Sequence, residues 1–178
     1  SAEEKGLLGS KYYTSNPLIP LVNSSFVLNI DGVPFIDEPG SFEVIDGDHS
    51  DLRAYFEKFA KKNGIKLDEN EEQISLKFIR GDHYSFVQAG IPSFLIQEGR
   101  LPVNKPLEEY AWLKYFYTSN IYHSPFDDLH QFINYDAAAG FAKMLLNFIL
   151  FMDKEVDSPK MKRESPYYSE YLKLRRTN

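Results

Sequence analysis

The chain has 178 residues, a formal net charge of −6 and a hydrophobic fraction of 43%. This length fits one domain with a sizeable core, and the composition excludes an intrinsically disordered chain. The acidic balance disfavours nucleic-acid binding, because phosphate contacts need a basic surface. The absence of cysteine excludes disulfides, thiol catalysis and thiolate zinc sites, so His, Asp and Glu are the metal ligands left.

Helices and strands are predicted to alternate along the first 64 residues. Residues 7–14 suit a short helix that Asn16-Pro17 and Pro20 stop. Residues 25–30 and 41–45 have the pattern of buried strands. Ser50 is a credible N-cap for a helix whose apolar residues recur at helical spacing until Gly64.

The middle of the chain continues this alternation. We expect a solvated acidic loop over residues 68–72, a strand over 74–79, a helix over 84–89 closed by Gly90, and a buried strand over 92–96. Residues 98–120 form a long, aromatic-rich connection that is partly helical and typical of a lid. Strands alternating with helices predict one α/β domain, a three-layer sandwich with a largely parallel or mixed central sheet.

The apolar run over residues 137–152 is too short for the ~20 apolar residues of a spanning helix. Asp136, Lys143, Asn147 and Lys154 fall on one line at helical spacing, which predicts a nearly buried helix with a narrow solvent stripe and no membrane span. We expect residues 1–155 to form the domain. The basic, tyrosine-rich residues 156–178 are expected to be a tail that docks on it rather than a binding patch.

Two adjacent carboxylates, Glu3 and Glu4, open the chain. They fit a solvated helix start, where the dipole favours them. They also fit a metal hydrolase, in which neighbouring side chains on extended backbone point opposite ways, so that one binds the metal and the other faces a reactive water. Asp31 follows a strand, where ligands gather in open α/β sheets, or is a turn residue before Gly32.

His123 begins a loop after the aromatic connection, either as a structural residue or as a ligand. Asp127 and Asp128 are close enough in sequence to orient its imidazole. A second polar motif, residues 81–86, joins a strand to a helix, with Asp82 as the expected cap and His83 packed over it.

Together, four sequence motifs resemble the zinc exopeptidase family, metallopeptidase family twenty-eight, that contains bacterial aminopeptidases, glutamate carboxypeptidase II and the glutaminyl cyclases. The resemblance extends to about Met152. The motifs are Glu3-Glu4-Lys5-Gly6-Leu7-Leu8-Gly9-Ser10, Leu28-Asn29-Ile30-Asp31, Gly81-Asp82-His83-Tyr84-Ser85-Phe86 with Ala89-Gly90-Ile91-Pro92, and Tyr122-His123-Ser124-Pro125-Phe126-Asp127-Asp128.

The resemblance implies an aminopeptidase that removes N-terminal residues from a peptide substrate with two zinc ions. Glu3 becomes the general base, Glu4 and His123 ligands of the first zinc, and Asp31 a ligand of the second. The substrate-binding or supporting residues it implies are Asp82, His83, Tyr122, Asp127, Asp128, Tyr110 and Trp112, with the aromatic lid lining the pocket for the first side chain.

The chain departs from the family pattern because family members carry an earlier His ligand and a metal-bridging Asp, together with the first strands of the sheet. Zinc favours about four ligands. We therefore expect a C-terminal portion of a catalytic domain whose partner is the missing N-terminal half. The isolated chain is expected to bind zinc poorly and to have little activity.

Two alternatives stay open. One is a glutaminyl cyclase-like aminoacyltransferase with a single zinc, although the cyclases typically have Trp where this chain has Tyr122. The other is a non-catalytic peptidase-like binding module without metal. The resemblance also implies a periplasmic or secreted location, and the sequence leaves a homo-oligomer open.

Overall fold

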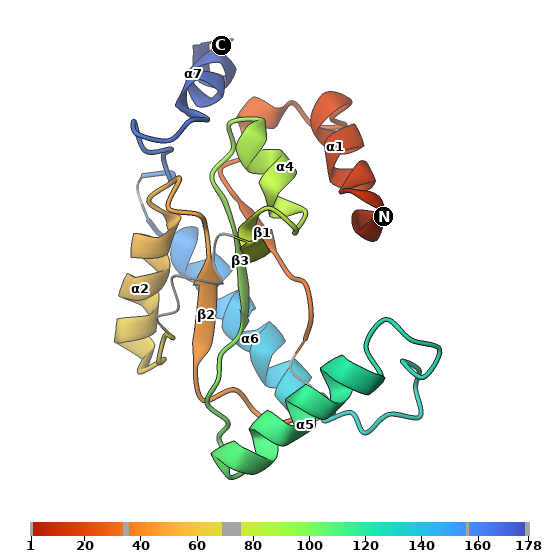
Figure 1. Ribbon diagram of the computed structural model, residues 1–178. Coiled ribbons are helices and arrows are strands. Elements are labelled where there is room, and N and C mark those ends of the chain that lie inside the picture. The colour runs from red at the N-terminus through yellow and green to blue at the C-terminus, as the bar shows by residue number, and fades with distance from the viewer. Residues whose placement is uncertain (1, 34–35, 69–75, 156, 177–178) are drawn as a thin grey trace.

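The computed structural model describes residues 2–33, 36–68, 76–155 and 157–176 (Figure 1). The helices and strands in this part of the chain are, in order, η1 (Glu3–Lys5), α1 (Leu8–Ser15), η2 (Leu21–Asn23), β1 (Val27–Asn29), β2 (Phe42–Ile45), α2 (Leu52–Asn63), α4 (His83–Gln88), β3 (Ser93–Glu98), α5 (Leu107–Asn120), α6 (Tyr135–Met152) and α7 (Tyr168–Arg176).

Most predicted elements are confirmed, and one is wrong. The strand expected over residues 74–79 is helical at 76–78, and residues 74–75 lie outside the described part. Alternation over so few residues does not distinguish a strand from one helical turn. Here Phe78 alone is buried, against His83 and Tyr84. The acidic loop at 68–72 lies outside the described residues except for Asp68.

The start of α2 differs slightly from the prediction. The residue in the N-cap position is Asp51, not Ser50, and the Ser50 hydroxyl accepts a weak hydrogen bond of 3.4 Å from the N–H of Leu52. Gly64 ends the helix in the left-handed conformation, as glycine does at many helix C-termini.

The described strands form a mixed sheet in the order β1-β3-β2. β1 runs parallel to β3, with Val27 opposite Ser93, whereas β2 runs antiparallel to β3, with Glu43 opposite Gln97. The carboxyl ends of β1 and β3 therefore lie at the same edge of the sheet. Side chains that follow these two strands are brought together there.

Helices cover both faces of this sheet (Figure 1). Phe94 and Ile96 of β3 point into a core shared with α2 and α6. Leu95, between them, points to the opposite face, where it packs with Val87 of α4. This alternation is the ordinary two-residue period of a strand buried on both sides.

Helix α6 buries only one stripe, formed by Ala137, Phe141, Leu145, Phe148 and Met152. Leu146, Ile149 and Leu150 are about half exposed. The prediction of a nearly buried helix is therefore wrong for this structure, because the three-stranded sheet covers a single side of α6. By length and composition alone α6 could cross a membrane, but its buried stripe belongs to the protein core.

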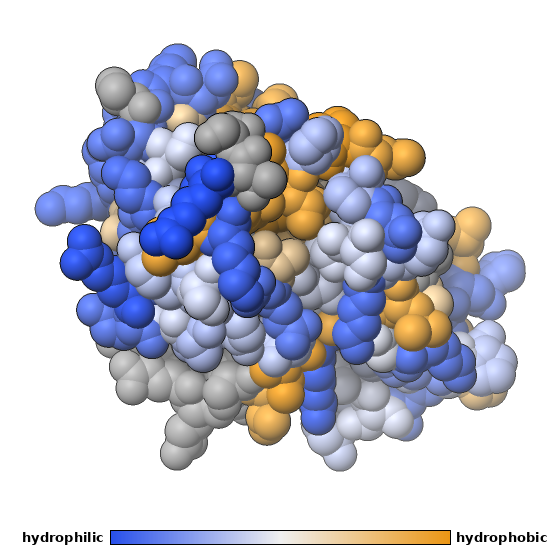
Figure 2. Space-filling model, turned by 90° about the horizontal axis from the view of Figure 1, so that it is seen from above, coloured by the Kyte–Doolittle hydropathy of each residue, from blue (hydrophilic) through white to orange (hydrophobic). Residues whose placement is uncertain are grey.

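The C-terminal segment packs against the body of the domain. The guanidinium of Arg175 in α7 donates hydrogen bonds of 2.7 and 3.1 Å to the backbone carbonyls of Val22 and Ser24. The hydroxyls of Tyr167 and Tyr84 lie 3.1 Å apart. From the end where α7 lies, hydrophilic side chains dominate the surface, with separate hydrophobic patches between them (Figure 2).

Candidate functional site

The Glu3-Glu4 pair lies on a short 3-10 turn, η1, and not on the extended backbone expected from the sequence. Gly6 and Leu7 then both adopt positive φ, 97° and 60°, and turn the chain into α1. Burial of the Leu7 side chain fixes this turn in a backbone region that L-residues rarely occupy. Successive residues of a 3-10 helix project about 120° apart, so the two carboxylates still point in different directions.

A buried pair of hydroxyls holds this segment against the second polar motif. The Ser10 hydroxyl of α1 lies 2.9 Å from the Ser85 hydroxyl of α4, and it also lies within bonding distance, 3.1 Å, of the Leu7 carbonyl. Tyr13 and Phe86 extend the contact between the same two helices. The position of the two carboxylates therefore depends on α4, about 75 residues further along the chain.

Glu4 and His123 meet across the fold. Oε1 of Glu4 lies 2.7 Å from Nε2 of His123, and both side chains are more than half exposed. His123 adopts a left-handed conformation, φ 58°, and its ring stacks on Tyr122 with a centroid distance of 3.7 Å. Strained backbone of this kind is concentrated at functional sites, where the surrounding structure holds it.

Asp31 lies two residues beyond the end of β1, at the same edge of the sheet. The residue as a whole is exposed, yet its carboxyl group has lost hydration and faces other carboxylates. This desolvation, followed by the charges of Asp82 and Glu4, raises the pKa of Asp31, while His123 opposes the effect. The pKa therefore responds to both members of the Glu4–His123 pair.

The pKa of Glu3 is raised in the same way. Its causes are burial, then the negative charges of Asp31, Glu4 and Asp82, with His123 acting in the opposite direction. A carboxyl group that gains affinity for a proton in this way is suited to general-base chemistry. Burial, and then the negative charges of Glu4, Asp31, Glu3 and Asp127, raise the pKa of Tyr122. The structure thus gathers an acidic group of residues, with one imidazole, at the carboxyl end of β1.

His83 is a buried supporting residue. Its side chain is fully enclosed, with Nδ1 3.5 Å from the amide nitrogen of Asn29 and its ring against Phe78. Burial lowers the pKa of His83 to about 4, and the charge of Asp82 only partly opposes this. A Cβ at Gly81 would lie 2.6 Å from the His83 ring, so glycine is required there.

Asp82 connects His83 with the acidic group. It is in the N-cap position of α4, but its side chain makes no capping hydrogen bond. Its Oδ1 is buried and has no hydrogen-bond partner among the described residues. The negative charge of Asp82 contributes to the raised pKa values of Asp31 and Glu3.

Asp127 and Asp128 contact groups other than the His123 ring. Asp127 accepts a hydrogen bond of 3.1 Å from the Tyr117 hydroxyl, and Asp128 contacts the backbone and ring of His130. The structure thus gives no support to their expected role in orienting His123. Their carboxylates hold the loop after α5 in shape instead.

The aromatic connection is partly helical, as expected, and its role as a lid stays a prediction. It is largely the helix α5, on which Tyr110 is buried and donates a hydrogen bond of 2.9 Å to Glu98. Trp112 is exposed and stacks on Phe116. Tyr110 thus has a partner on β3 and Trp112 one on α5, and their role in lining a substrate pocket stays a prediction.

Sequence patterns did not reveal the contacts made by Asn29 and by the Ser10–Ser85 pair. Each lies inside a motif that was noted for other residues. For Ser10 and Ser85 the available signal was a small polar residue on a helix that packs against the domain, which predicts a buried hydroxyl in need of a partner.

The donor types suit zinc, since Glu4, Asp31 and His123 offer carboxylate oxygen and imidazole nitrogen. Among the described residues, however, no group of three or more potential ligands comes close enough to hold a metal ion. Zinc sites have about four ligands, so the two that converge here, Glu4 and His123, are an incomplete set.

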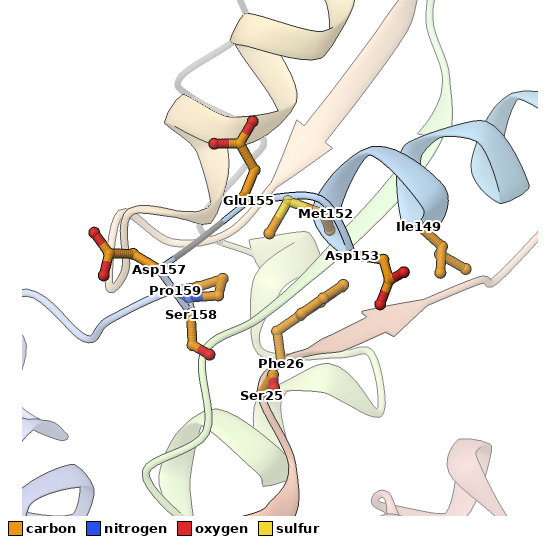
Figure 3. Close-up of a pocket in the computed structure, with 9 residues that line it drawn as sticks. All are labelled: Ser25, Phe26, Ile149, Met152, Asp153, Glu155, Asp157, Ser158 and Pro159. Carbon is orange, nitrogen blue, oxygen red and sulfur yellow. The ribbon is translucent and has the colours of Figure 1, made fainter.

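A separate hollow of about 290 Å³ lies where α6 ends, beside Phe26. Three carboxylates surround it, but Figure 3 shows that those of Asp153, Glu155 and Asp157 point in different directions. Glu155 also forms an ion pair with Lys58, whose ammonium nitrogen lies 2.9 Å from each carboxylate oxygen. This hollow therefore has no converging donor set for a cation.

Comparison with known proteins agrees with this fold. The profile described as Peptidase family M28 matches residues 1–149, and the chain therefore belongs to this peptidase family. The aminopeptidase from Aneurinibacillus sp. strain AM-1 has a similar structure, with a TM-score of 0.54 and 20% identity. The match covers 91% of this chain and only 32% of that one, and at this identity it establishes the fold alone. No curated protein matches the chain.

Proposed function

We propose that this chain is the C-terminal part of the catalytic domain of a zinc-dependent aminopeptidase. The observation that carries the proposal is the 2.7 Å contact between Glu4 and His123, which come from opposite ends of the matched region. Membership of a peptidase family supports the reaction class. The similar structure of a bacterial aminopeptidase supports the preference for N-terminal residues.

In this proposal Glu4 and His123 hold one zinc and Asp31 contributes to a second. Bound zinc would polarise the scissile carbonyl and lower the pKa of a water molecule. Glu3 acts as the general base: its raised pKa lets it take a proton and pass it to the leaving amine. Tyr122 stacks on the His123 ring and limits its rotation.

We propose further that an N-terminal half of the domain completes the site and the sheet. The chain spans about a third of the similar aminopeptidase, and α6 leaves Leu146, Ile149 and Leu150 exposed. β1 is also the edge strand of the described sheet. Additional strands beside β1 would cover this apolar face and extend the fold to a three-layer sandwich.

The test compares this chain with the same chain joined to the polypeptide encoded upstream of Ser1. We expect the joined protein to bind zinc and to hydrolyse a leucine anilide, and this chain alone to do neither to a useful extent. Glu3→Gln in the joined protein should lower kcat by about 10²–10⁴ and leave zinc content unchanged. His123→Ala should lower zinc content. Glu164→Gln, an exposed carboxylate outside the site, is the matched control.

The result separates the proposal from its alternatives. One zinc per chain with cyclisation of N-terminal glutamine would instead indicate a glutaminyl cyclase-like enzyme. A joined protein with no zinc and no turnover would contradict the proposal and favour a binding module. Turnover by the isolated chain that Glu3→Gln abolishes would refute the need for an N-terminal half.

A further inference from the structure

A larger cavity, of about 690 Å³, lies between the sheet and α5. We name it the Glu43 cavity. It is bounded by the beginning of β2, the end of β3 and the first two turns of α5, which pass close together in Figure 1. None of its lining residues belongs to the acidic group around Glu4 and His123. Its volume is within the range of small-molecule sites in proteins.

The cavity contains one buried carboxylate with spare bonding capacity. The Glu43 side chain is only 8% exposed, and its Oε2 accepts hydrogen bonds of 2.6 Å from both Lys77 and Gln97. Its Oε1 is buried and has no hydrogen-bond partner among the described residues. An unsatisfied buried carboxylate oxygen carries a cost, which a further hydrogen-bond donor would remove.

A positive group on the rim of the same cavity is held only loosely. The Arg100 guanidinium has a single ion-pair contact of 3.7 Å, from Nε to Asp68, and is 71% exposed. Its remaining nitrogens have no partner among the residues that the structure describes. A guanidinium in this state offers the paired donors that bind a carboxylate.

The other charged groups of the cavity are already satisfied. Glu98 accepts from the Tyr110 hydroxyl at 2.9 Å and from Lys114 at 2.8 Å. Leu101, Leu107 and Ala111 add apolar side chains to the lining of the cavity. The cavity is thus lined by a carboxylate with one unpartnered oxygen, a guanidinium with one long ion-pair contact, and apolar side chains.

We propose that the Glu43 cavity binds a free amino acid with an apolar side chain. The α-ammonium donates a hydrogen bond to Oε1 of Glu43, Arg100 binds the carboxylate, and the side chain lies on Leu101 and Leu107. A ligand with only one of these charges would leave either Oε1 of Glu43 or the remaining guanidinium nitrogens of Arg100 without a further partner. The proposal goes beyond the proposed function and does not depend on it, because no residue of the zinc site takes part.

The test titrates L-leucine into the ¹⁵N-labelled chain in the presence of EDTA and follows backbone amide shifts. We expect saturable shifts at Gly99, Arg100 and Ala111, with N-acetyl-leucine and leucinamide binding about tenfold more weakly, since each lacks one charge. Arg100→Gln, at an exposed position, should raise the Kd about tenfold. Arg163→Gln, the matched exposed control, should change it by less than about twofold.

Glu43→Gln provides a second variant that keeps the shape of the side chain and removes its charge. This variant should bind leucine more weakly than the parent chain does, and it should bind N-acetyl-leucine with the same low affinity as the parent. Absence of shifts at about 10 mM leucine, or equal affinity in Arg100→Gln and the parent chain, would overturn the proposal. Shifts confined to residues 122–124 would also overturn it, and would place the amino acid at the Glu4–His123 pair. The EDTA makes the result independent of whether the chain is part of a zinc peptidase.

Discussion

Lowering the pH from 7 to 5 should destabilise this protein through one buried side chain, His83. The pKa of this imidazole is lowered from 6.5 to about 4 by burial. The unfolded chain therefore binds a proton at a pH where the folded protein does not. The stability that the neutral imidazole contributes is complete above pH 6.5 and is lost as the pH falls towards 4.

The size of the effect follows from the two pKa values. With 6.5 in the unfolded state and about 4 in the folded state, the free energy of unfolding falls by about 2 kcal/mol between pH 7 and pH 5, and by roughly 3 kcal/mol once both states are protonated. The cause is structural: Nε2 is buried and has no partner among the described residues that could accept its proton.

Urea denaturation at several pH values between 5 and 7 measures this directly. His83→Gln removes the titrating group, so the pH dependence of its unfolding free energy should be shallower than that of the parent by about 2 kcal/mol over this range. His130→Gln is the matched control, because the His130 side chain is 94% exposed and its loss should leave the slope unchanged. Equal slopes for the parent and His83→Gln would refute the assignment of a neutral, buried His83.

Two further pairs of substitutions test the packing. Phe148→Ala removes a ring that packs against Phe56 at the centre of the core, and it should lower the free energy of unfolding by about 3–5 kcal/mol. Leu150→Ala, at a half-exposed position on α6, should lower it by about 1 kcal/mol or less. Similar losses for the two variants would contradict the description of α6 as buried on one side. Gly90→Ala should destabilise by more than about 1 kcal/mol and loosen the contact with α7, because φ is +83° and a Cβ would lie 2.5 Å from the backbone nitrogen of Tyr171. Gly140→Ala, in α6 with open space around the added Cβ among the described residues, should instead stabilise by about 0.5–1 kcal/mol, and thermal melts of both variants would decide the matter.

Local sequence patterns predicted most of the fold because its strands and helices have clear periods. The stop after α1, the Gly64 terminus of α2 and the buried strand before Glu98 all follow from local residue chemistry. The error at residues 76–78 arose where the pattern was short. The overestimate of burial for α6 arose because the amount of sheet available to cover a helix is a property of the whole fold.

The candidate site was predictable in part. The motifs singled out Glu4 and His123, and these residues lie 2.7 Å apart, although their roles as ligands remain predictions. The partners of Asp127 and Asp128 could not be predicted, because proximity in sequence does not fix which group a loop carboxylate meets. The Glu43 cavity could not be predicted from the sequence either, because it depends on the strand register that places Glu43 opposite Gln97.

The hydrogen bond between Ser10 and Ser85 makes the residues allowed at these two positions depend on each other, although the positions lie in distant sequence motifs. Loss of the Ser10 hydroxyl removes the hydrogen-bond partner of the buried Ser85 hydroxyl, whereas loss of the Ser85 hydroxyl leaves Ser10 with the Leu7 carbonyl. Replacing both with alanine removes the need for the bond and should be nearly neutral for stability. A double-mutant cycle should thus give a non-additive coupling between the two positions. Over evolutionary time, related chains are expected to change these two positions together or to leave both alone.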